Sequence, residues 1–270
     1  MKERAPRHEH HTPVSTRAVA LVTGGSRGVG AATALSLADR GYDVLITYRN
    51  KAARASEVAN DVLQRGVRAL AVECDVTKHE DRNRLFALFA KWSDHLDLLV
   101  LNASGGLERD LVAADPQYPM RINHDAQLAL LDGALPLMPR GATVIFVTSH
   151  WAHRYGEVEQ FPAYMPEAAS KHAGEEALRR QQNKLTDQGI RLLVVTGDLI
   201  EGTITPKLLE RGAPGSIEQR RADVGSLPTT IDMGEAIALS AIDTTLASGH
   251  TVVVRGALES LRPVAATPEG

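Results

Sequence analysis

Short, wholly apolar runs alternate along the chain with segments whose apolar residues recur at helical spacing. The apolar runs predict buried strands over residues 19–23, 43–48, 68–76, 96–103, 141–149, 191–197 and 250–256. The segments between them predict helices over residues 31–38, 52–65, 80–91, 123–131, 167–188 and 233–247. Strands that are apolar on both faces and alternate with helices are typical of a parallel sheet covered on both sides. The pattern therefore predicts an α/β fold, a single-domain doubly wound parallel sheet of the Rossmann-like kind, with ligands at the carboxyl ends of the strands.

Domain organisation follows from the two stretches that lack this pattern. Residues 1–17 are polar and include Pro6, Pro13 and several histidines, which predicts a disordered tail before one domain over residues 18–270. Residues 200–228 are rich in Gly, Pro and Arg and follow a predicted strand. We interpret them as a lid or substrate-binding segment over the ligand crevice, with a plain surface loop as the alternative.

Composition excludes several classes of partner. A net charge of -3 gives no electrostatic basis for binding nucleic acid or an anionic membrane. Cys74 is the only cysteine, so an intramolecular disulfide and a thiolate metal cage are excluded, and no metal site is expected. No apolar run approaches the roughly 18 residues that span a bilayer. We expect a cytoplasmic protein without a membrane or nucleic-acid partner.

The sequence TGGSRGVG, residues 23–30, joins the first predicted strand to the first predicted helix. Glycines in this position let the backbone approach a pyrophosphate, and the helix N-terminus offers free N–H groups. The turn therefore predicts a dinucleotide site that includes Gly24, Ser26, Arg27, Gly28, Val29 and Gly30. The alternative is a turn that serves packing only.

The end of the second predicted strand indicates which dinucleotide binds. A site for NAD places an acid there, on the ribose hydroxyls. This chain has Arg49 and Asn50 after Tyr48 instead. Arg49 and Arg27 can together bind a 2′-phosphate through charge-assisted hydrogen bonds, so the sequence favours NADP(H) as the cofactor.

Seven motifs in order resemble the short-chain dehydrogenase/reductase family over residues 18–257. They are TGGSRGVG, CDVT, LNASGG, RINHDAQ, VIFVTS, TGDLIEGT and SGHTVVVRGA, with Leu101, Ser104 and Thr196 departing from the family pattern. The resemblance implies hydride transfer between NADPH/NADP and a small-molecule carbonyl substrate. It also implies a homodimer or homotetramer. On the matching positions it assigns catalytic roles to Ser149, Tyr164, Lys171 and Asn123, and further cofactor contacts to Tyr48, Arg49, Asp75, Val76, Asn102, Ala103 and Lys171.

The stretch FPAYMPEAASKHAG, residues 161–174, departs from the family's pattern of a tyrosine four residues before the lysine. Glu167 occupies that position, and Tyr164 lies seven residues before Lys171. Tyr164 can still be the proton donor, because seven residues make nearly two helical turns and return to one face. Pro166 suits the first turn of a helix, so Tyr164 is expected just before the helix. A spacing of seven also resembles the bacterial enoyl-thioester reductases.

Two other proton sources stay open. Glu167 would need a pKa raised well above its usual value, whereas Lys171 at i+4 and the helix N-terminus favour its ionised form, so a structural pair is the preferred interpretation. Alternatively, substrate hydroxyls or a water supply the proton, with help from Ser149 or His150. Some reductases of aromatic polyketide biosynthesis resemble this pattern.

The sequence thus predicts an NADPH-dependent ketoreductase with an atypical proton donor. Trp151 can stack on a flat substrate, and together with the long 200–228 segment it suggests a bulky, aromatic or polyketide-like ketone. His150 can relay a proton or be structural. The alternatives are an enoyl reductase and a non-catalytic NADP(H)-sensing protein.

Overall fold

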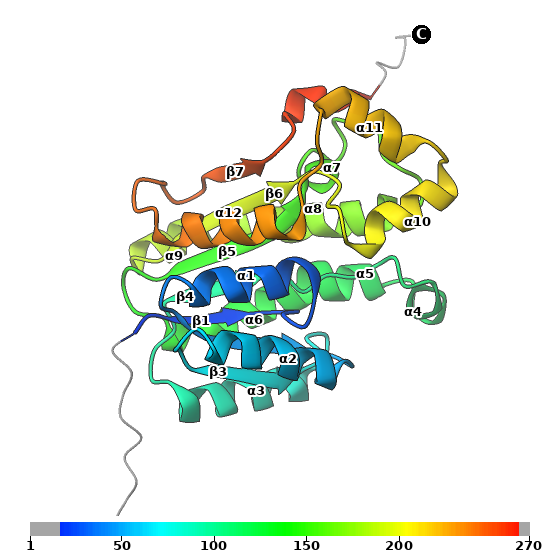
Figure 1. The fold of residues 1–270 in the computed structure, drawn as a ribbon. Helices are drawn as coiled ribbons and strands as arrows, with labels where there is room; N and C mark the ends of the chain where they lie inside the picture. Colours follow the sequence, from blue (N-terminus) through cyan, green and yellow to red (C-terminus); the bar gives the residue numbers. More distant parts are fainter. Residues whose placement is uncertain (1–16, 265–270) are drawn as a thin grey trace, which may run out of the picture.

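A seven-stranded parallel sheet forms the centre of the computed structural model, which describes residues 17–264 (Figure 1). The strand order is β3-β2-β1-β4-β5-β6-β7. The strands are β1 (Val19–Val22), β2 (Asp43–Tyr48), β3 (Ala69–Glu73), β4 (Leu98–Leu101), β5 (Thr143–Ser149), β6 (Arg191–Gly197) and β7 (Thr251–Val254). Every residue of β1 and β4 is buried, as expected of a sheet covered on both faces. The predicted fold is confirmed, whereas the predicted tail over residues 1–17 falls, except for Arg17, outside the described residues.

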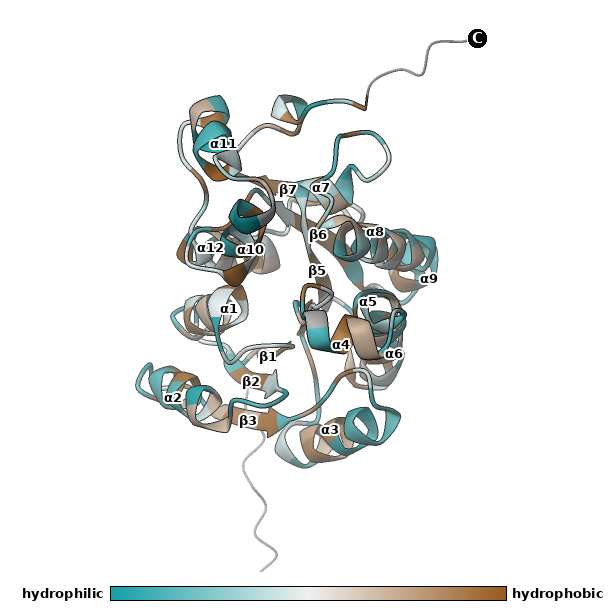
Figure 2. Cartoon of the chain, turned by 90° about the vertical axis from the view of Figure 1, so that its right-hand side faces the viewer, coloured by the Kyte–Doolittle hydropathy of each residue, from teal (hydrophilic) through white to brown (hydrophobic). Residues whose placement is uncertain are grey.

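Helices cover both faces of the sheet (Figure 2). One layer consists of α1 (Gly28–Ala38), α2 (Ala52–Leu63) and α12 (Thr230–Ile242), and the other of α3 (His79–Trp92), α6 (Ala126–Ala134), α8 (Met165–Arg180) and α9 (Gln182–Asp187). Each layer has its own apolar core. Leu37 of α1 packs in one core with Met233 of α12, and Phe89 of α3 packs in the other with Leu130 of α6. None of the helices within residues 17–264 has the length and apolar character needed to cross a bilayer.

Shorter helices lie beyond the carboxyl ends of the strands (Figure 1). They are α4 (Arg109–Ala114), α5 (Tyr118–Met120), α7 (His150–His153), α10 (Ile204–Gly212) and α11 (Ser216–Val224). The last two lie within residues 200–228, where the sequence predicts no regular element. Each of these helices is only nine residues long and glycines separate them, so the segment has no long stretch of helical periodicity.

The helix predicted over residues 167–188 starts earlier and is broken. It begins at Met165 because Pro166 fits the first helical turn, where no N–H partner is needed. Tyr164 is its N-cap residue, as predicted. The chain leaves the helix after Arg180 and resumes as α9. The helix predicted from Asn123 begins as a π-helical turn over Arg121–Asp125 and continues as α6.

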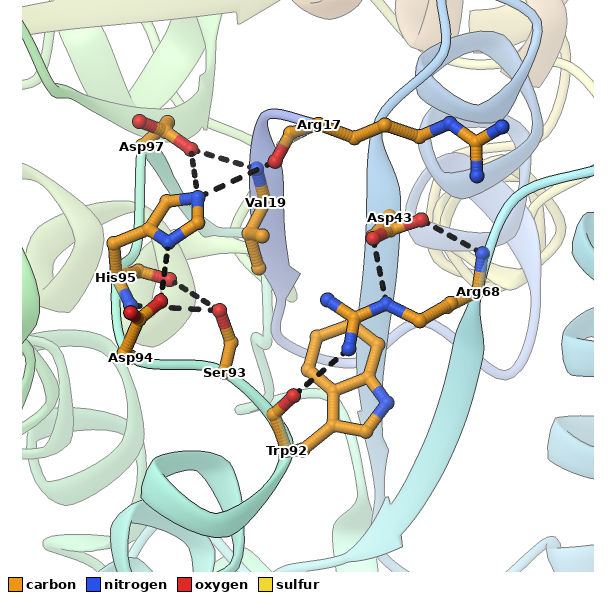
Figure 3. Close-up of polar contacts among 9 residues, drawn as sticks. All are labelled: Arg17, Val19, Asp43, Arg68, Trp92, Ser93, Asp94, His95 and Asp97. Carbon is orange, nitrogen blue, oxygen red and sulfur yellow. Dashed lines mark hydrogen bonds and ion pairs between the residues drawn. The ribbon is translucent and has the colours of Figure 1, made fainter. Parts of the chain in front are cut away.

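Two carboxylates link neighbouring strands at their amino ends (Figure 3). Asp97 accepts a hydrogen bond of 2.7 Å from the backbone N–H of Val19, the first residue of β1. Asp43 accepts hydrogen bonds from the backbone N–H and Nε of Arg68, both 2.7 Å long. The guanidinium of Arg68 lies 4.7 Å from the ring centroid of Trp92. This Asp–Arg–Trp cluster fixes the edge of the sheet that is remote from the predicted ligand crevice.

Candidate active site

A cleft of about 950 Å³ runs along the carboxyl edge of the sheet. Every predicted cofactor-binding residue lines it: Gly24, Ser26, Arg27, Gly28, Val29, Gly30, Tyr48, Arg49, Asp75, Val76, Asn102, Ala103 and Lys171. Ser149 and Tyr164 line it too. Asn123 is buried behind the cleft wall. The structure therefore brings together all but one of the residues that the sequence selects.

The glycine turn between β1 and α1 is shaped by steric limits at three positions. Gly24 and Gly28 have φ of +68° and +58°, which residues with a side chain rarely adopt. A Cβ at Gly30 would lie 2.4 Å from the carbonyl oxygen of Gly24, whereas one at Gly28 would meet nothing within 4 Å. The turn is thus closed towards the protein and open towards the cleft, at the N-terminus of α1. This cradle fits the pyrophosphate of a dinucleotide.

Asn102 holds the end of β4 against this turn. Its Nδ2 donates to the carbonyl oxygen of Thr23 over 2.9 Å, and its backbone N–H donates to Thr23 Oγ1 over 2.9 Å. The backbone N–H of Ala103 donates to the same hydroxyl over 3.0 Å. These bonds give Asn102 and Ala103 a positioning role in addition to their place in the cleft wall.

The two arginines selected for a 2′-phosphate share the same end of the cleft but differ in their contacts. Arg27 is exposed at the rim. Arg49 donates to the hydroxyl of Tyr118 over 2.6 Å and lies 3.9 Å from Glu108, so it must leave these partners to reach a phosphate. Arg54 on α2 lines this end as well, and sequence analysis missed it. A positively charged residue in the first turn of the helix that follows β2 is the sequence feature that could have identified Arg54.

Ser149 and Tyr164 form a hydrogen-bonded pair in the cleft. The distance between Ser149 Oγ and Tyr164 Oη is 2.8 Å. Ser149 ends β5 and also accepts the backbone N–H of Ala152 over 3.2 Å, which fixes its side chain at the start of α7. Burial raises the pKa of Tyr164, and the charge of Lys171 opposes that shift. The phenol is therefore protonated at neutral pH and can donate a proton.

Glu167 lies between Lys171 and Ser104. Its Oε1 is 3.4 Å from Lys171 Nζ and accepts the hydroxyl of Ser104 over 2.9 Å. Burial raises the pKa of Glu167 although Lys171 lowers it, which differs from the ionised, low-pKa pair favoured by the sequence. Burial alone would lower the pKa of Lys171, but the nearby Tyr164 and Glu167 raise it. Ser104 departs from the family pattern, and no signal in the sequence points to its contact with Glu167.

Asn123 is buried next to the cleft wall and connects the segment after β4 to α8. Its Nδ2 donates to the carbonyl oxygen of Gly105 over 2.6 Å and to Ser170 Oγ over 2.9 Å. A Cβ at Gly174 of α8 would lie 2.0 Å from the carbonyl oxygen of Asn123, so the π-helical turn and α8 are in backbone contact. Asn123 thus positions the helix that carries Lys171, and a part in proton relay stays a prediction.

The two aromatic residues after Ser149 have different surroundings. His150 is buried, its Nδ1 is 3.0 Å from Thr196 Oγ1 and its Nε2 is 2.8 Å from the carbonyl oxygen of Arg255. Burial lowers the pKa of His150, so it is a neutral, structural histidine and lies outside the cleft lining. Trp151 lines the cleft, as predicted. Within residues 17–264 no cluster of histidine, cysteine and carboxylate side chains could hold a metal ion.

Comparisons with known proteins agree with this geometry. The family described as short chain dehydrogenase matches residues 18–211. The chain is 30% identical over 197 residues to 1-cyclohexenylcarbonyl-CoA reductase of Streptomyces collinus, which covers 72% of this chain and 68% of that protein. The structure is similar, at 25% identity, to two solved structures. The promiscuous reductase LugOII, which catalyses keto-reduction at C1 during lugdunomycin biosynthesis, gives a TM-score of 0.74 over 89% of this chain and 97% of its own. The angucycline C-6 ketoreductase LanV, with bound NADP, gives 0.72 over 89% and 95%. The chain belongs to the short-chain dehydrogenase/reductase family, as its motifs predict.

Proposed function

We propose that the protein is an NADPH-dependent ketoreductase in which Tyr164 protonates the carbonyl oxygen of the substrate. The observation that carries this proposal is the 2.8 Å contact between Tyr164 Oη and Ser149 Oγ inside the cleft. Two hydroxyls at this distance can both contact one carbonyl oxygen. Tyr164 lies three residues before the position that the family's tyrosine occupies, yet its hydroxyl still contacts Ser149. Tyr164 is the N-cap residue of α8, so the start of that helix holds it in this place.

In this proposal, different residues of the cleft bind the cofactor, orient the carbonyl and deliver the proton. NADPH, when bound, supplies the hydride. The glycine turn and the N-terminus of α1 would hold its pyrophosphate. Ser149 orients the carbonyl, and Tyr164, protonated at neutral pH because burial raises its pKa, delivers the proton. Lys171 stabilises the tyrosinate that remains, because its positive charge lowers the pKa of Tyr164. Glu167 keeps Lys171 protonated.

The walls of the cleft support a bulky ketone as the substrate. Beyond Ser149 the lining continues to Trp151, Leu107, Ile204 and Leu208, which supply apolar surface for a ring system. Of the two solved relatives named above, one catalyses keto-reduction during lugdunomycin biosynthesis and the other is an angucycline C-6 ketoreductase. NADP bound to LanV agrees with the cofactor favoured by Arg27 and the absence of an acid after β2 in this chain.

A second candidate activity is enoyl reduction. The Streptomyces collinus relative is named for 1-cyclohexenylcarbonyl-CoA, a thioester with a conjugated double bond. The spacing of seven between Tyr164 and Lys171 also resembles enoyl-thioester reductases. The Ser149–Tyr164 pair favours ketone reduction, because it presents two hydroxyl groups to one carbonyl oxygen.

The proposal is tested by NADPH oxidation, followed at 340 nm, across a panel of aromatic and polycyclic ketones, simple ketones and enoyl thioesters. We expect turnover of polycyclic ketones with NADPH and at least about tenfold lower kcat/KM with NADH. Turnover of enoyl thioesters alone would establish the second activity. Tight NADPH binding without turnover of any substrate would favour a sensing protein and overturn the proposal.

The variant Glu167→Gln separates the two candidate proton donors. Glutamine keeps an oxygen for the Ser104 hydroxyl but removes the charge. If Tyr164 is the donor, ketone reduction at neutral pH should stay within about tenfold of wild type. Because Glu167 raises the pKa values of both Tyr164 and Lys171, the fall in kcat at alkaline pH should begin at lower pH in the variant. The measurement is kcat against pH.

Glu175→Gln is the matched control, because Glu175 is a second buried glutamate on α8, paired with His153 and Arg179 away from the cleft. This variant should lower the melting temperature and leave the alkaline limb of the pH profile in place. Loss of activity by about 10²-fold or more in Glu167→Gln, with a normal melting curve, would identify Glu167 as the proton donor instead.

A further inference from the structure

A buried ion pair joins α11 to the carboxyl end of β6. Asp198 directly follows β6 and has a fully buried side chain, and Arg220 of α11 is 5% exposed. Arg220 Nε lies 3.1 Å and 3.0 Å from the two carboxylate oxygens, and Arg220 Nη2 donates to Oδ2 over 2.6 Å. Charge-assisted, bidentate bonds of this kind fix the guanidinium in one orientation. Since the two residues are 22 positions apart, the pair closes residues 199–219 into a loop, and the first part of that loop, up to Leu208, lines the cleft.

The fixed guanidinium lies against the indole of Trp151. The distance from Arg220 Cζ to the ring centroid is 5.2 Å, within the range of a cation–π contact. The ring of Phe161 lies 5.4 Å from the indole, tilted by 49°. Trp151 lines the cleft with Asp198 and Leu199. Stacking of a substrate on the face covered by Arg220 is therefore blocked, and the indole is a wall held in one position.

The backbone around Asp198 is arranged to accommodate this pair. A Cβ at Gly256 would lie 2.5 Å from Asp198 Oδ2, so the carboxylate needs a glycine after β7. Arg220 also donates two hydrogen bonds to Ser260, from Nη1 to the carbonyl oxygen over 3.0 Å and from Nη2 to the hydroxyl over 2.9 Å. The pair thus links β6, the segment after β7, α11 and the cleft wall. A buried pair of this kind carries a desolvation cost that an apolar contact would not, which points to a specific positioning role.

We propose that Arg220 is a positioning residue for the ketone, because its pairing with Asp198 fixes Trp151 and α11 as the outer wall of the substrate half of the cleft. This inference rests on the proposed function, since it concerns the substrate of the same site. Arg220 does not touch the glycine turn or the Ser149–Tyr164 pair through any contact described above. Its removal should therefore weaken ketone binding and leave the chemical step and NADPH binding intact.

The chain offers a matched control with the same three side-chain types. At the remote edge of the sheet, Arg68 pairs with Asp43 and lies over Trp92 (Figure 3). The variants Arg220→Met and Arg68→Met each remove a guanidinium from an aspartate and an indole. Both should lower the melting temperature. Arg220→Met should raise the KM for a polycyclic ketone by about tenfold with kcat within about threefold, and Arg68→Met should change neither constant by more than about twofold.

Fluorescence gives a readout that needs no turnover. In a Trp92→Phe background Trp151 is the only tryptophan, and we expect Arg220→Met, but not Arg68→Met, to shift its emission maximum. If Arg220→Met fails to fold, Arg220→Lys is used instead. It keeps the positive charge, and its KM for the ketone should be raised by less than about tenfold. An unchanged KM and an unchanged Trp151 emission in a folded Arg220 variant would overturn the inference, as would equal effects in the two methionine variants. If wild type reduces no ketone while the emission still shifts, the proposed function fails and the positioning of Trp151 by Arg220 stands.

Discussion

Replacing Tyr164 with phenylalanine should lower kcat for ketone reduction by about 10²- to 10⁴-fold, the range usual for loss of a positioned proton donor. The variant keeps the ring in the apolar cluster that contains Trp151 and removes only the hydroxyl group beside Ser149. The dissociation constant for NADPH should be unchanged, because the Tyr164 hydroxyl is hydrogen-bonded to Ser149 and not to the glycine turn. Stopped-flow measurement of NADPH oxidation under single-turnover conditions shows whether the loss is in the chemical step.

Tyr155→Phe is the control for this substitution. Tyr155 packs against the same apolar cluster and its ring lies 5.9 Å from that of His172, but it is outside the cleft lining. This variant should reduce ketones at the wild-type rate. Near wild-type activity in Tyr164→Phe would show that Tyr164 is not the proton donor, and Glu167→Gln would then distinguish Glu167 from a substrate hydroxyl or water.

The fold could be predicted because it depends on patterns that tertiary packing does not override. Continuous apolar runs such as β4 and β5 are buried on both faces, and a parallel sheet covered by the helices between its strands provides such an environment. The helices α10 and α11 could not be predicted in this way. The position of α11 is fixed by long-range contacts such as that of Arg220 with Asp198, and local periodicity does not record such a contact.

The cofactor half of the site could be predicted because the backbone of its phosphate-binding turn requires glycine at fixed positions. Gly24 and Gly28 have positive φ, and the space beside Gly30 is closed, so the glycine spacing carries a structural meaning. The proton-donor half depends on side-chain packing between segments distant in sequence. Sequence alone leaves Tyr164, Glu167 and a substrate hydroxyl or water as alternatives, because the 2.8 Å contact with Ser149 and the burial of Glu167 arise only when β5 and α8 pack together. The homodimer or homotetramer implied by the resemblance stays a prediction.

Removing Lys171 should have the second large effect, on both activity and stability. Lys171→Met deletes the cation that lowers the pKa of Tyr164, so tyrosinate is less stable and kcat should fall by about 10²-fold or more. It also leaves the buried carboxyl of Glu167 without its partner at 3.4 Å. Breaking a buried pair in this way costs about 3–5 kcal/mol of the free energy of unfolding near neutral pH. Arg179→Met is the control, because it breaks another i,i+4 pair on α8, the one with the buried Glu175, and should destabilise the protein without lowering kcat.

The pH dependence of that loss of stability identifies its cause. Burial already raises the pKa of Glu167 above its usual 4.5, and without Lys171, which lowers it, the pKa rises further. Above pH 4.5 the unfolded chain releases this proton while the folded variant retains it. The free energy of unfolding of Lys171→Met, relative to wild type, should therefore fall as pH rises from 4.5 through the raised pKa, and then level off. Urea unfolding between pH 4 and pH 8 measures this slope, and the double variant Lys171→Met/Glu167→Gln should abolish it. A loss of stability that is the same at every pH would instead mean that the aliphatic stem of Lys171, not its charge, stabilises the site.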